Sequence, residues 1–310
     1  MRETIIPEVF IERWERFYGM SNAKSIISNL KRPDSKIIVH NSLKIEYKEL
    51  KNQLEERGFI FEEIPEFNGL IVQFEPFSIV STPEYLGGMF SIQAISSLIP
   101  PLSLQPTPKS IVADLTASPG IKTCFLAQQM QNQGTIIAIE KSKQRISALK
   151  ANIVRMGVIN TIILHFDSIL FPKLNIHVEY ILLDAPCSGT GLKLTKNKRL
   201  GPRMLKDISR QVQRQKLLLE AAWSQLKPNG TLVYSTCSLE PEEGEVQISN
   251  FLDKHENEAI LIPLPINVGT SGNKTNWIRP LHPQLSGTLR IFPKLGYDGF
   301  FTAIIKKVIL

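Results

Sequence analysis

Hydrophobic and polar positions divide the chain into a short irregular part and a longer regular one. In the first part, apolar residues at helical spacing predict short helices over residues 7–30. Residues 36–39 and 71–74 are rich in β-branched and aromatic side chains, and residues 47–57 have a helical pattern. These segments predict a helical start followed by a small α/β unit.

The next stretch joins the two parts. Its pattern predicts a helix over residues 90–98. A proline-rich connector is expected over residues 100–108, because proline is rare inside helices.

From residue 111 onward, short β-rich runs alternate with helical segments. These runs occupy residues 111–115, 134–139, 161–165, 180–183 and 231–235. The alternation predicts a doubly wound, mostly parallel sheet with helices on both faces. Two more runs, 289–292 and 300–305, are joined by a link too short for a helical crossover, so they predict an antiparallel C-terminal hairpin. The predicted α/β fold therefore has a seven-stranded sheet.

Length and composition fit two domains. A chain of 310 residues exceeds what one core usually organises, so we assign the helices and small α/β unit to residues 1–80 and a larger domain to residues 81–310. With 43% hydrophobic and 21% charged residues, a sizeable core is available. No apolar stretch approaches the roughly 20 residues of a bilayer span, and residues 1–10 are unlike a signal peptide, so we expect a cytoplasmic protein without a membrane partner.

The charge is positive and uneven. A formal net charge of +7 favours a polyanionic partner, although many proteins without one share it. Between residues 193 and 216, nine basic residues stand against one acid, Asp207. They are Lys193, Lys196, Lys198, Arg199, Arg203, Lys206, Arg210, Arg214 and Lys216. The stretch is either a binding patch or the solvated face of a helix.

The three cysteines, Cys124, Cys187 and Cys237, have no CxxC or Cys/His spacing. A disulfide framework or a zinc site is therefore not expected. Cys124 lies in a helical segment beside apolar residues, so we expect it in the core.

The loop after the first regular strand has the features of a nucleotide-binding site. It runs from Asp114 through small residues to a helix, and ligands of open α/β sheets bind beyond the carboxyl ends of the strands. Glu140 ends the second strand, where an acid accepts hydrogen bonds from ribose hydroxyls, and Asp167 follows the third, where an adenine amino group could be bound. A single glycine and Pro119 disfavour a dinucleotide, because Pro119 removes an N–H donor for a pyrophosphate. Each acid could also simply cap a helix.

Two cysteines follow neighbouring predicted strands. Cys187 and Cys237 both come just past a strand exit, and consecutive strands usually lie side by side, so the thiols should converge on one pocket together with Asp184. A thiolate that adds to carbon 6 of a pyrimidine makes carbon 5 nucleophilic enough to accept a methyl group. An acid such as Asp184 could stabilise N3 during this step, and a second thiol could assist release.

Two segments of this region resemble motifs of a known family. D-A-P-C-S-G-T-G at residues 184–191 and Y-S-T-C-S-L-E-P-E-E-G-E at residues 234–245 look like the Nop/Sun (Fmu-like) family of RNA 5-methylcytosine methyltransferases. The likeness runs from about Tyr85 to Phe301. It implies a Rossmann-like class I methyltransferase fold, S-adenosylmethionine as cofactor, and methylation of carbon 5 of cytosine in RNA.

The resemblance also implies roles for individual residues. Cys237 would be the nucleophile, Cys187 would assist product release, and Asp184 would contact the target base. The implied cofactor-binding residues are Thr116, Ala117, Ser118, Pro119, Gly120, Ile121, Lys122, Glu140, Asp167 and Asp184. The small unit before Tyr85 is similar to the family's RNA-contacting N-terminal domain.

The chain departs from the family pattern at four positions. Ser118 and Ile121 replace the usual alanine and glycine of the cofactor loop, Gly244 replaces asparagine, and Lys294 stands where many members have histidine. These changes could loosen cofactor affinity or reshape the loop after Cys237, but they remove no group that the mechanism needs.

The substrate expected from the resemblance is RNA. A basic chain of this length resembles archaeal-type tRNA methyltransferases, with ribosomal RNA as the alternative. RNA would cross the basic stretch while a flipped-out cytosine enters the pocket. We expect a monomer without a metal ion.

Other classes fit the motifs less well. DNA cytosine-5 methyltransferases take their nucleophile from the Pro-Cys motif, and amino-group methyltransferases carry Asn/Asp-Pro-Pro-aromatic where this chain has residues 184–187. A catalytically weak RNA-binding assembly factor remains a second alternative, because the cofactor loop is altered.

Overall fold

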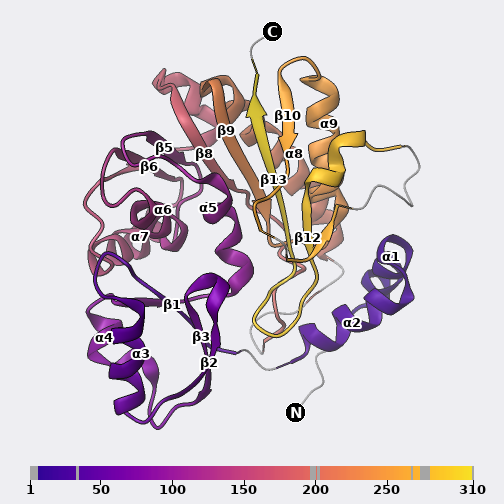
Figure 1. Ribbon diagram of the computed structural model, residues 1–310. Helices are drawn as coiled ribbons and strands as arrows, with labels where there is room; N and C mark the ends of the chain where they lie inside the picture. Colours follow the sequence, from indigo (N-terminus) through magenta and orange to yellow (C-terminus); the bar gives the residue numbers. More distant parts are fainter. Residues whose placement is uncertain are drawn as a thin grey trace.

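The computed structural model describes residues 6–32, 35–195, 200, 203–266, 268–272 and 280–308. Two helices open the chain, α1 (Glu8–Tyr18) and α2 (Met20–Leu30). Their buried faces, which include Phe10 and Trp14, pack against Leu239 and other apolar residues of the C-terminal half. Figure 1 shows the helix pair and the small sheet at opposite sides of the molecule.

A four-stranded antiparallel sheet follows the helix pair. Its strands are β1 (Ile37–His40), β2 (Ile60–Ile64), β3 (Gly69–Phe74) and β4 (Phe90–Ile92), in the order β2-β3-β1-β4. Helices α3 (Tyr47–Glu56) and α4 (Pro83–Leu86) belong to the same unit. The small α/β unit is therefore present, and β4 extends it beyond residue 80; the domain division at that residue stays a prediction.

Two expectations for the joining stretch are wrong. Residues 90–98 are not a helix, because β4 pairs with β1 (Ile38 opposite Ile92) and only a short 3₁₀ turn (Ile95–Ser97) follows. The proline-rich connector holds a helix, α5 (Ile99–Leu104). Its prolines lie in the first turn, where a missing N–H costs no hydrogen bond.

The larger sheet contains the predicted parallel core. Five strands run parallel, in the order β9-β8-β5-β6-β7. Their bounds are β5 (Ile111–Asp114), β6 (Thr135–Glu140), β7 (Thr161–His165), β8 (Val178–Asp184) and β9 (Leu226–Thr236). The sheet reverses its winding direction at β5, which pairs with both β6 and β8. A ligand site is expected at such a switch point.

The C-terminal hairpin completes the sheet. β13 (Phe300–Lys307) pairs antiparallel with β12 (Leu289–Ile291) on one side and with β9 on the other. Two short strands, β10 (Ala259–Ile262) and β11 (Thr270–Ser271), join the seven predicted ones. The predicted α/β fold, mostly parallel with an antiparallel hairpin, is confirmed.

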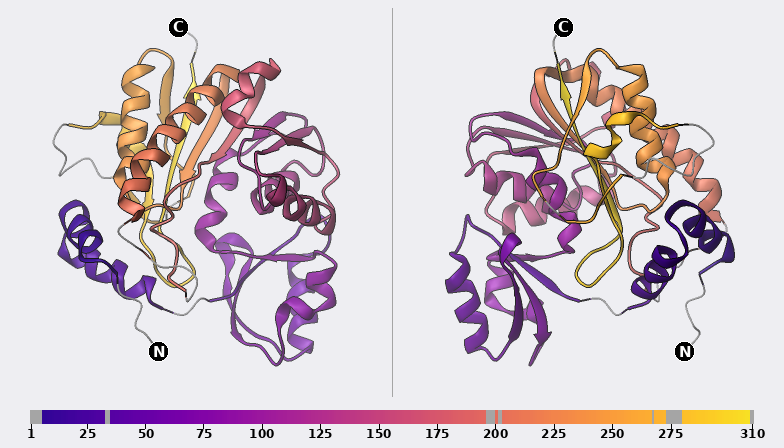
Figure 2. Two further views of the ribbon diagram at one scale, coloured as in Figure 1. Left: turned by 180° about the vertical axis from the view of Figure 1, so that it is seen from behind. Right: turned by 45° about the vertical axis from the view of Figure 1, so that its right-hand side comes forward.

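Helices cover both faces of this sheet. Val112 and Leu182 pack with α6 (Ile121–Gln129) and α7 (Lys143–Arg155) on one face. Alternate strand residues such as Ile181 and Tyr234 pack with α8 (Arg203–Gln225) and α9 (Glu245–Lys254) on the other. Figure 2 (left) shows the latter pair in front of the sheet. Within the described ranges, the helices are too short or too polar to span a bilayer.

Candidate active site

The two predicted cysteines meet beyond the carboxyl ends of β8 and β9. These strands pair in parallel with Asp184 opposite Ser235, so the loops that follow them begin at the same level. The Sγ atoms of Cys187 and Cys237 lie 3.3 Å apart. Both cysteines are partly exposed and line one cavity of about 340 Å³. The predicted convergence of the thiols is therefore seen in the structure.

The two thiols differ in their surroundings. The hydrogen bond with Cys237, together with burial, raises the pKa of Cys187 well above its usual range. The Cys187 thiol therefore keeps its proton at neutral pH. Cys124 is buried in the core, as expected, and burial raises its pKa to about 12.

Asp184 is fixed beside the cysteine pair by two donors. The hydroxyl of Ser235 donates to its Oδ1 over 2.8 Å, and the Lys122 ammonium lies 2.7 Å from its Oδ2. Lys122 also donates to the hydroxyl of Ser97 over 2.9 Å. Burial lowers the pKa of Lys122, but the charge and hydrogen bond of Asp184 outweigh it and raise the pKa, so Lys122 stays charged.

Two further acids line the same cavity. Glu140 accepts a hydrogen bond from the Ser142 N–H over 2.7 Å. Asp167 accepts from the Ile169 N–H over 3.2 Å and pairs with Lys141 over 2.5 Å. Burial alone would raise the pKa of Asp167, but these donors lower it by a larger amount. The pKa of Asp167 therefore lies below its usual value, and the carboxyl is ionised at neutral pH.

Asp114 lies apart from these acids. It is buried below the cofactor loop, where the Thr123 hydroxyl donates to it over 2.7 Å, and burial raises its pKa to about 6. Asp114 therefore supports the loop from inside.

The predicted cofactor loop separates two cavities. Thr116 and Ser118 line the larger one, and the same two residues also line a second cavity of about 230 Å³. Four other loop residues, Ala117, Pro119, Ile121 and Lys122, line only the second cavity. Gly120 lines neither, because it begins α6 at φ +101° with Leu149 directly against it.

The serine that replaces the family's alanine has a structural partner. The Ser118 hydroxyl donates to the Arg145 carbonyl over 3.0 Å, and an Arg145 N–H returns a bond to the Ser118 carbonyl over 2.7 Å. Asn152 donates to the Pro119 carbonyl over 2.9 Å. Three hydrogen bonds therefore fasten the loop to α7, and the serine hydroxyl supplies one of them.

Part of the basic stretch reaches this site. Lys206, Arg210 and Arg214 recur every four residues on α8, and Arg214 lines the larger cavity. Lys193 is buried, so it is not part of an exposed patch, which corrects that part of the expectation. Lys196, Lys198 and Arg199 and the side chain of Arg203 lie outside the described residues.

Sequence reasoning missed several residues of the site. Lys141 and Arg145 also line the larger cavity. Glu243 contacts the Cys187 loop, although the sequence gives only its place in the P-E-E motif.

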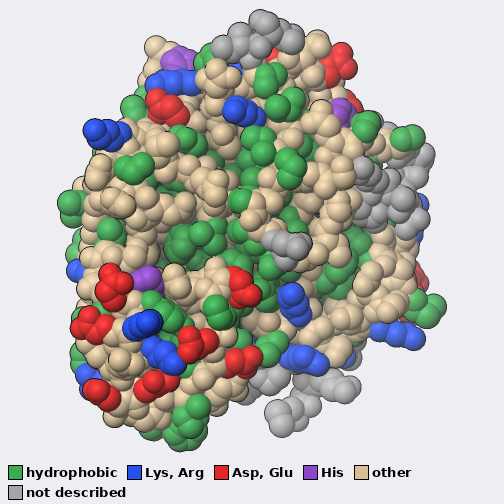
Figure 3. Space-filling model, viewed as in Figure 1, with side chains coloured by type: hydrophobic (Ala, Val, Ile, Leu, Met, Phe, Trp, Pro, Cys, Tyr) green, Lys and Arg blue, Asp and Glu red, His purple; other side chains and the backbone are tan. Residues whose placement is uncertain are grey.

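The small sheet has a different surface. Its residues 35–97 carry nine glutamates and five basic residues, and Figure 3 shows acidic and basic side chains intermixed at the lower left. Several are paired, including Lys51 with Glu63 and Arg57 with Glu84. This charge balance does not favour phosphate contacts, and an RNA-contacting role for the unit stays a prediction.

Comparison with known proteins gives relatives for the whole described fold. A family model described as "16S rRNA methyltransferase RsmB/F" matches residues 101–306. A 28S rRNA (cytosine-C(5))-methyltransferase of Mus musculus is 36% identical over 86% of this chain, which spans 34% of that relative's length. A tRNA (cytosine(49)-C(5))-methyltransferase of Pyrococcus abyssi is 33% identical, and the match covers 94% of both chains.

A solved structure agrees with this assignment. The crystal structure of a methyltransferase homologue from Pyrococcus horikoshii is 37% identical, with a TM-score of 0.86 over 97% of this chain and 95% of that one. The chain belongs to the RsmB/F (Nop/Sun) family of RNA methyltransferases.

Proposed function

We propose that this protein transfers a methyl group from S-adenosylmethionine to carbon 5 of cytosine in RNA. The observation that carries the proposal is the pair Cys187 and Cys237, 3.3 Å apart in a cavity that also contains Asp184. Two thiols at this separation beside an acid match a reaction that first attaches and later releases a pyrimidine.

The larger cavity has the groups that the cofactor requires. Glu140 and Asp167 present carboxylate oxygens for ribose hydroxyls and the adenine amino group, and Thr116 lines the same cavity. When bound, S-adenosylmethionine supplies an electrophilic methyl group. The two acids, at the ends of β6 and β7, would hold its ribose and adenine.

Cys237 starts the reaction by adding to the base. Its thiolate forms a bond to carbon 6, and the electron pair of the C5–C6 double bond moves into the ring. Lys122, held between Asp184 and Ser97, places a positive charge beside this developing negative charge. Because Lys122 and Ser235 both donate to Asp184, this carboxylate acts as an acceptor, for example for the exocyclic amino group of cytosine.

Product release requires a base. Carbon 5 would take the methyl group as the methyl–sulfur bond of the donor breaks and leaves its electron pair on the donor sulfur. The proton on carbon 5 must then leave, and the C5–H electron pair restores the double bond as the C6–S bond breaks and returns the Cys237 thiolate. Once Cys237 is bonded to carbon 6, its hydrogen bond with Cys187 weakens, which removes the largest cause of the raised pKa of Cys187. Cys187 can then release its own proton to solvent, and the resulting thiolate takes the proton from carbon 5, directly or through water.

Two variants test these roles. Cys237→Ala should abolish methylation of transcribed RNA, and retained methylation would contradict its role as nucleophile. Cys187→Ala should accumulate a covalent RNA adduct, which migrates slowly on a denaturing gel. Absence of that species would contradict the release role of Cys187.

Transfer RNA is the substrate that we propose. The match to the Pyrococcus abyssi tRNA enzyme covers 94% of both chains, whereas the mouse rRNA enzyme contains much additional sequence. Methylation of tRNA and rRNA transcripts, followed by bisulfite sequencing, distinguishes the two substrates. A non-catalytic assembly factor is disfavoured by the complete cysteine pair, and calorimetry that detects no S-adenosylmethionine binding would support it instead.

A further inference from the structure

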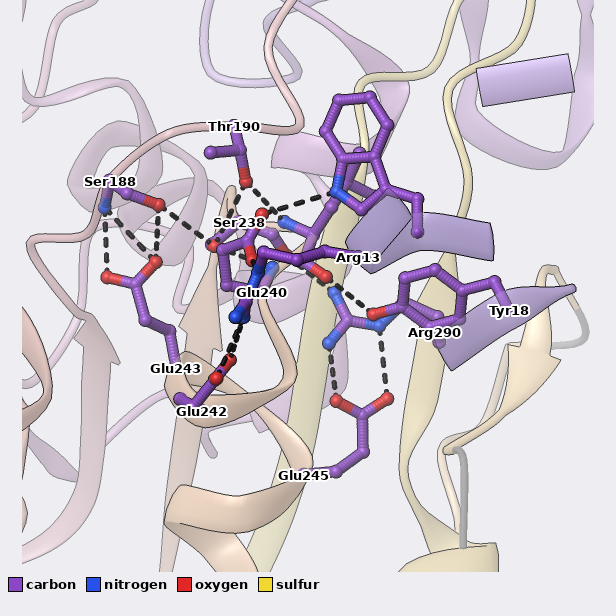
Figure 4. Close-up of polar contacts among 12 residues, drawn as sticks. Arg13, Tyr18, Ser188, Thr190, Ser238, Glu240, Glu242, Glu243, Glu245 and Arg290 are labelled. Carbon is purple, nitrogen blue, oxygen red and sulfur yellow. Dashed lines mark hydrogen bonds and ion pairs between the residues drawn. The ribbon is translucent and has the colours of Figure 1, made fainter. Parts of the chain in front are cut away.

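The segment directly after Cys237 carries four acidic side chains, Glu240, Glu242, Glu243 and Glu245. Glu240 and Glu242 bond to Arg13 of α1, and Glu245 pairs with the buried Arg290 of β12. Figure 4 shows these contacts spreading from one short segment. Glu243 is different, because its partners include the loop that carries Cys187.

Glu243 accepts hydrogen bonds from a set of donors around its carboxylate. Its Oε1 accepts from the Ser188 N–H over 2.9 Å and from the Gln215 side-chain amide over 3.0 Å. Its Oε2 accepts from the Ser188 hydroxyl over 2.5 Å. The side chain is fully buried. A carboxylate suits this site because it only accepts, whereas the amide of glutamine would turn a donor toward one of these donors.

A row of hydroxyl groups links Glu243 to both cysteine loops. Because Ser188 donates to Glu243, its oxygen accepts from the Ser238 hydroxyl, 3.1 Å away. Ser238 accepts from the Glu240 N–H over 2.9 Å and lies 3.3 Å from the Thr190 hydroxyl, which completes a directed chain. Ser188 and Ser238 each follow one of the two cysteines, so the hydrogen-bonded chain, shown in Figure 4, joins the two loops that carry the thiols.

We propose that Glu243 is a positioning residue that holds Cys187 at its working distance from Cys237 during product release. It acts through Ser188 and does not contact the base. The inference rests on the proposed function, in which Cys187 takes the proton from carbon 5. A displacement of Cys187 by about 1 Å would slow that proton transfer strongly while leaving the Cys237 attack in place.

The principal test is Glu243→Gln, with Glu242→Gln as the matched control. Glu242 carries the same side chain one residue earlier, but it bonds to Arg13 of α1 and not to the Cys187 loop. With Glu243→Gln, multiple-turnover methylation should fall about tenfold or more, and the covalent RNA adduct should accumulate on a denaturing gel. Methyl transfer in a single turnover should stay close to that of the unchanged enzyme, and Glu242→Gln should show neither effect.

A second variant guards against simple misfolding. Ser188→Ala removes one hydroxyl bond to Glu243 but keeps the backbone N–H bond, so the fold should survive. It should show the same adduct at a smaller amplitude. A purely structural defect would instead lower single-turnover and multiple-turnover methylation in the same proportion without extra adduct, and that result would overturn the proposal.

The two proposals can fail separately. If Cys187→Ala gives no adduct, the release role of Cys187 is wrong and the function of Glu243 falls with it. If Cys187→Ala accumulates adduct and neither Glu243→Gln nor Ser188→Ala does, the release role stands and the positioning role of Glu243 is wrong.

Discussion

Gly244 illustrates how a single residue adapts to its surroundings. A Cβ atom at this position would lie 2.6 Å from Nη2 of Arg290 and 3.0 Å from the ring of Phe301. Arg290 is itself buried and bonds to Glu245 and to the Ser238 carbonyl. The guanidinium therefore fills the space that a side chain at residue 244 would need.

Asp114 gives a pH-dependent prediction at the residue scale. Its pKa is raised from 3.8 to about 6, so the folded protein binds its proton more tightly than the unfolded chain. The associated stability is complete below about pH 4 and is lost as the pH rises to about 6. Relative to Asp114→Asn, the native protein should therefore lose roughly 3 kcal/mol of unfolding free energy between pH 4 and pH 7.

Urea denaturation of both proteins at several pH values measures this difference. Glu12→Gln, which changes an exposed carboxyl on α1, serves as the control and should show no comparable trend. A constant difference between Asp114→Asn and the native protein across this pH range would contradict the raised pKa of Asp114.

At the scale of elements, helix α1 fastens the loop that follows Cys237. Arg13 bonds to the buried Glu240 over 2.8 Å, the Trp14 indole N–H donates to Glu240 over 3.2 Å, and Tyr18 donates to the Leu239 carbonyl over 2.5 Å. Burial raises the pKa of Glu240, while the charge of Arg13 opposes that rise. The helix therefore stabilises a loop more than 200 residues away in the sequence.

Substituting Arg13 should lower the stability of the folded protein, because Glu240 would remain buried without a partner of opposite charge. In Arg13→Gln, Glu240 stays buried without its cation, so the unfolding free energy should fall by roughly 3–5 kcal/mol. The double variant Arg13→Gln/Glu240→Gln should recover much of the loss, because no unpaired charge remains. A double-mutant cycle, with unfolding in urea, measures the coupling energy between Arg13 and Glu240. Arg16→Gln on the same helix is the control. Purely additive effects of the two substitutions would contradict the pairing.

The elements also show what sequence could predict. The parallel strands and their acidic or thiol-bearing exits follow from local patterns, because Asp184, Cys187 and Cys237 stand directly after β-rich runs. The 3.3 Å contact of the thiols depends on the β8–β9 register, which no local pattern specifies. Likewise, the apolar positions of α1 predict a helix with one buried face. They do not predict that Arg13 and Trp14 on this helix bond to Glu240.

Short elements were the weakest part of the prediction. β4 has three residues, too few for a strand pattern to be distinguished from a helical one, and its pairing with β1 decides its conformation. The sequence does not predict α5, because its prolines are typical of a connector. In the structure they occupy the first turn of the helix, which tolerates proline.

At the scale of the whole molecule, a row of basic side chains on α8 leads toward the site. The row Lys206, Arg210 and Arg214 leads along α8 to the larger cavity, while the small sheet carries more acids than bases. If RNA follows this row, Lys206→Gln and Arg210→Gln should each weaken binding at low salt. Each should also reduce the slope of log affinity against log salt by about 1, one phosphate contact per residue.

Fluorescence anisotropy with a tRNA transcript over a range of salt concentrations measures these slopes. Lys109→Gln is the control, because this exposed residue precedes β5 and so lies at the amino-terminal end of that strand, away from the carboxyl ends where the site is. Unchanged slopes for both α8 variants would show that RNA takes another path.

The order in which the chain is synthesised bears on when the site can form. β13 inserts between β9 and β12, and the Gly299 N–H before it bonds to the Gly191 carbonyl over 2.8 Å, with no room for a side chain at either glycine. The Cys187 loop therefore gains its backing only after residues 299–307 have left the ribosome. A nascent chain contains both thiols before it can hold them together, so catalytic competence has to wait for the synthesis of β13.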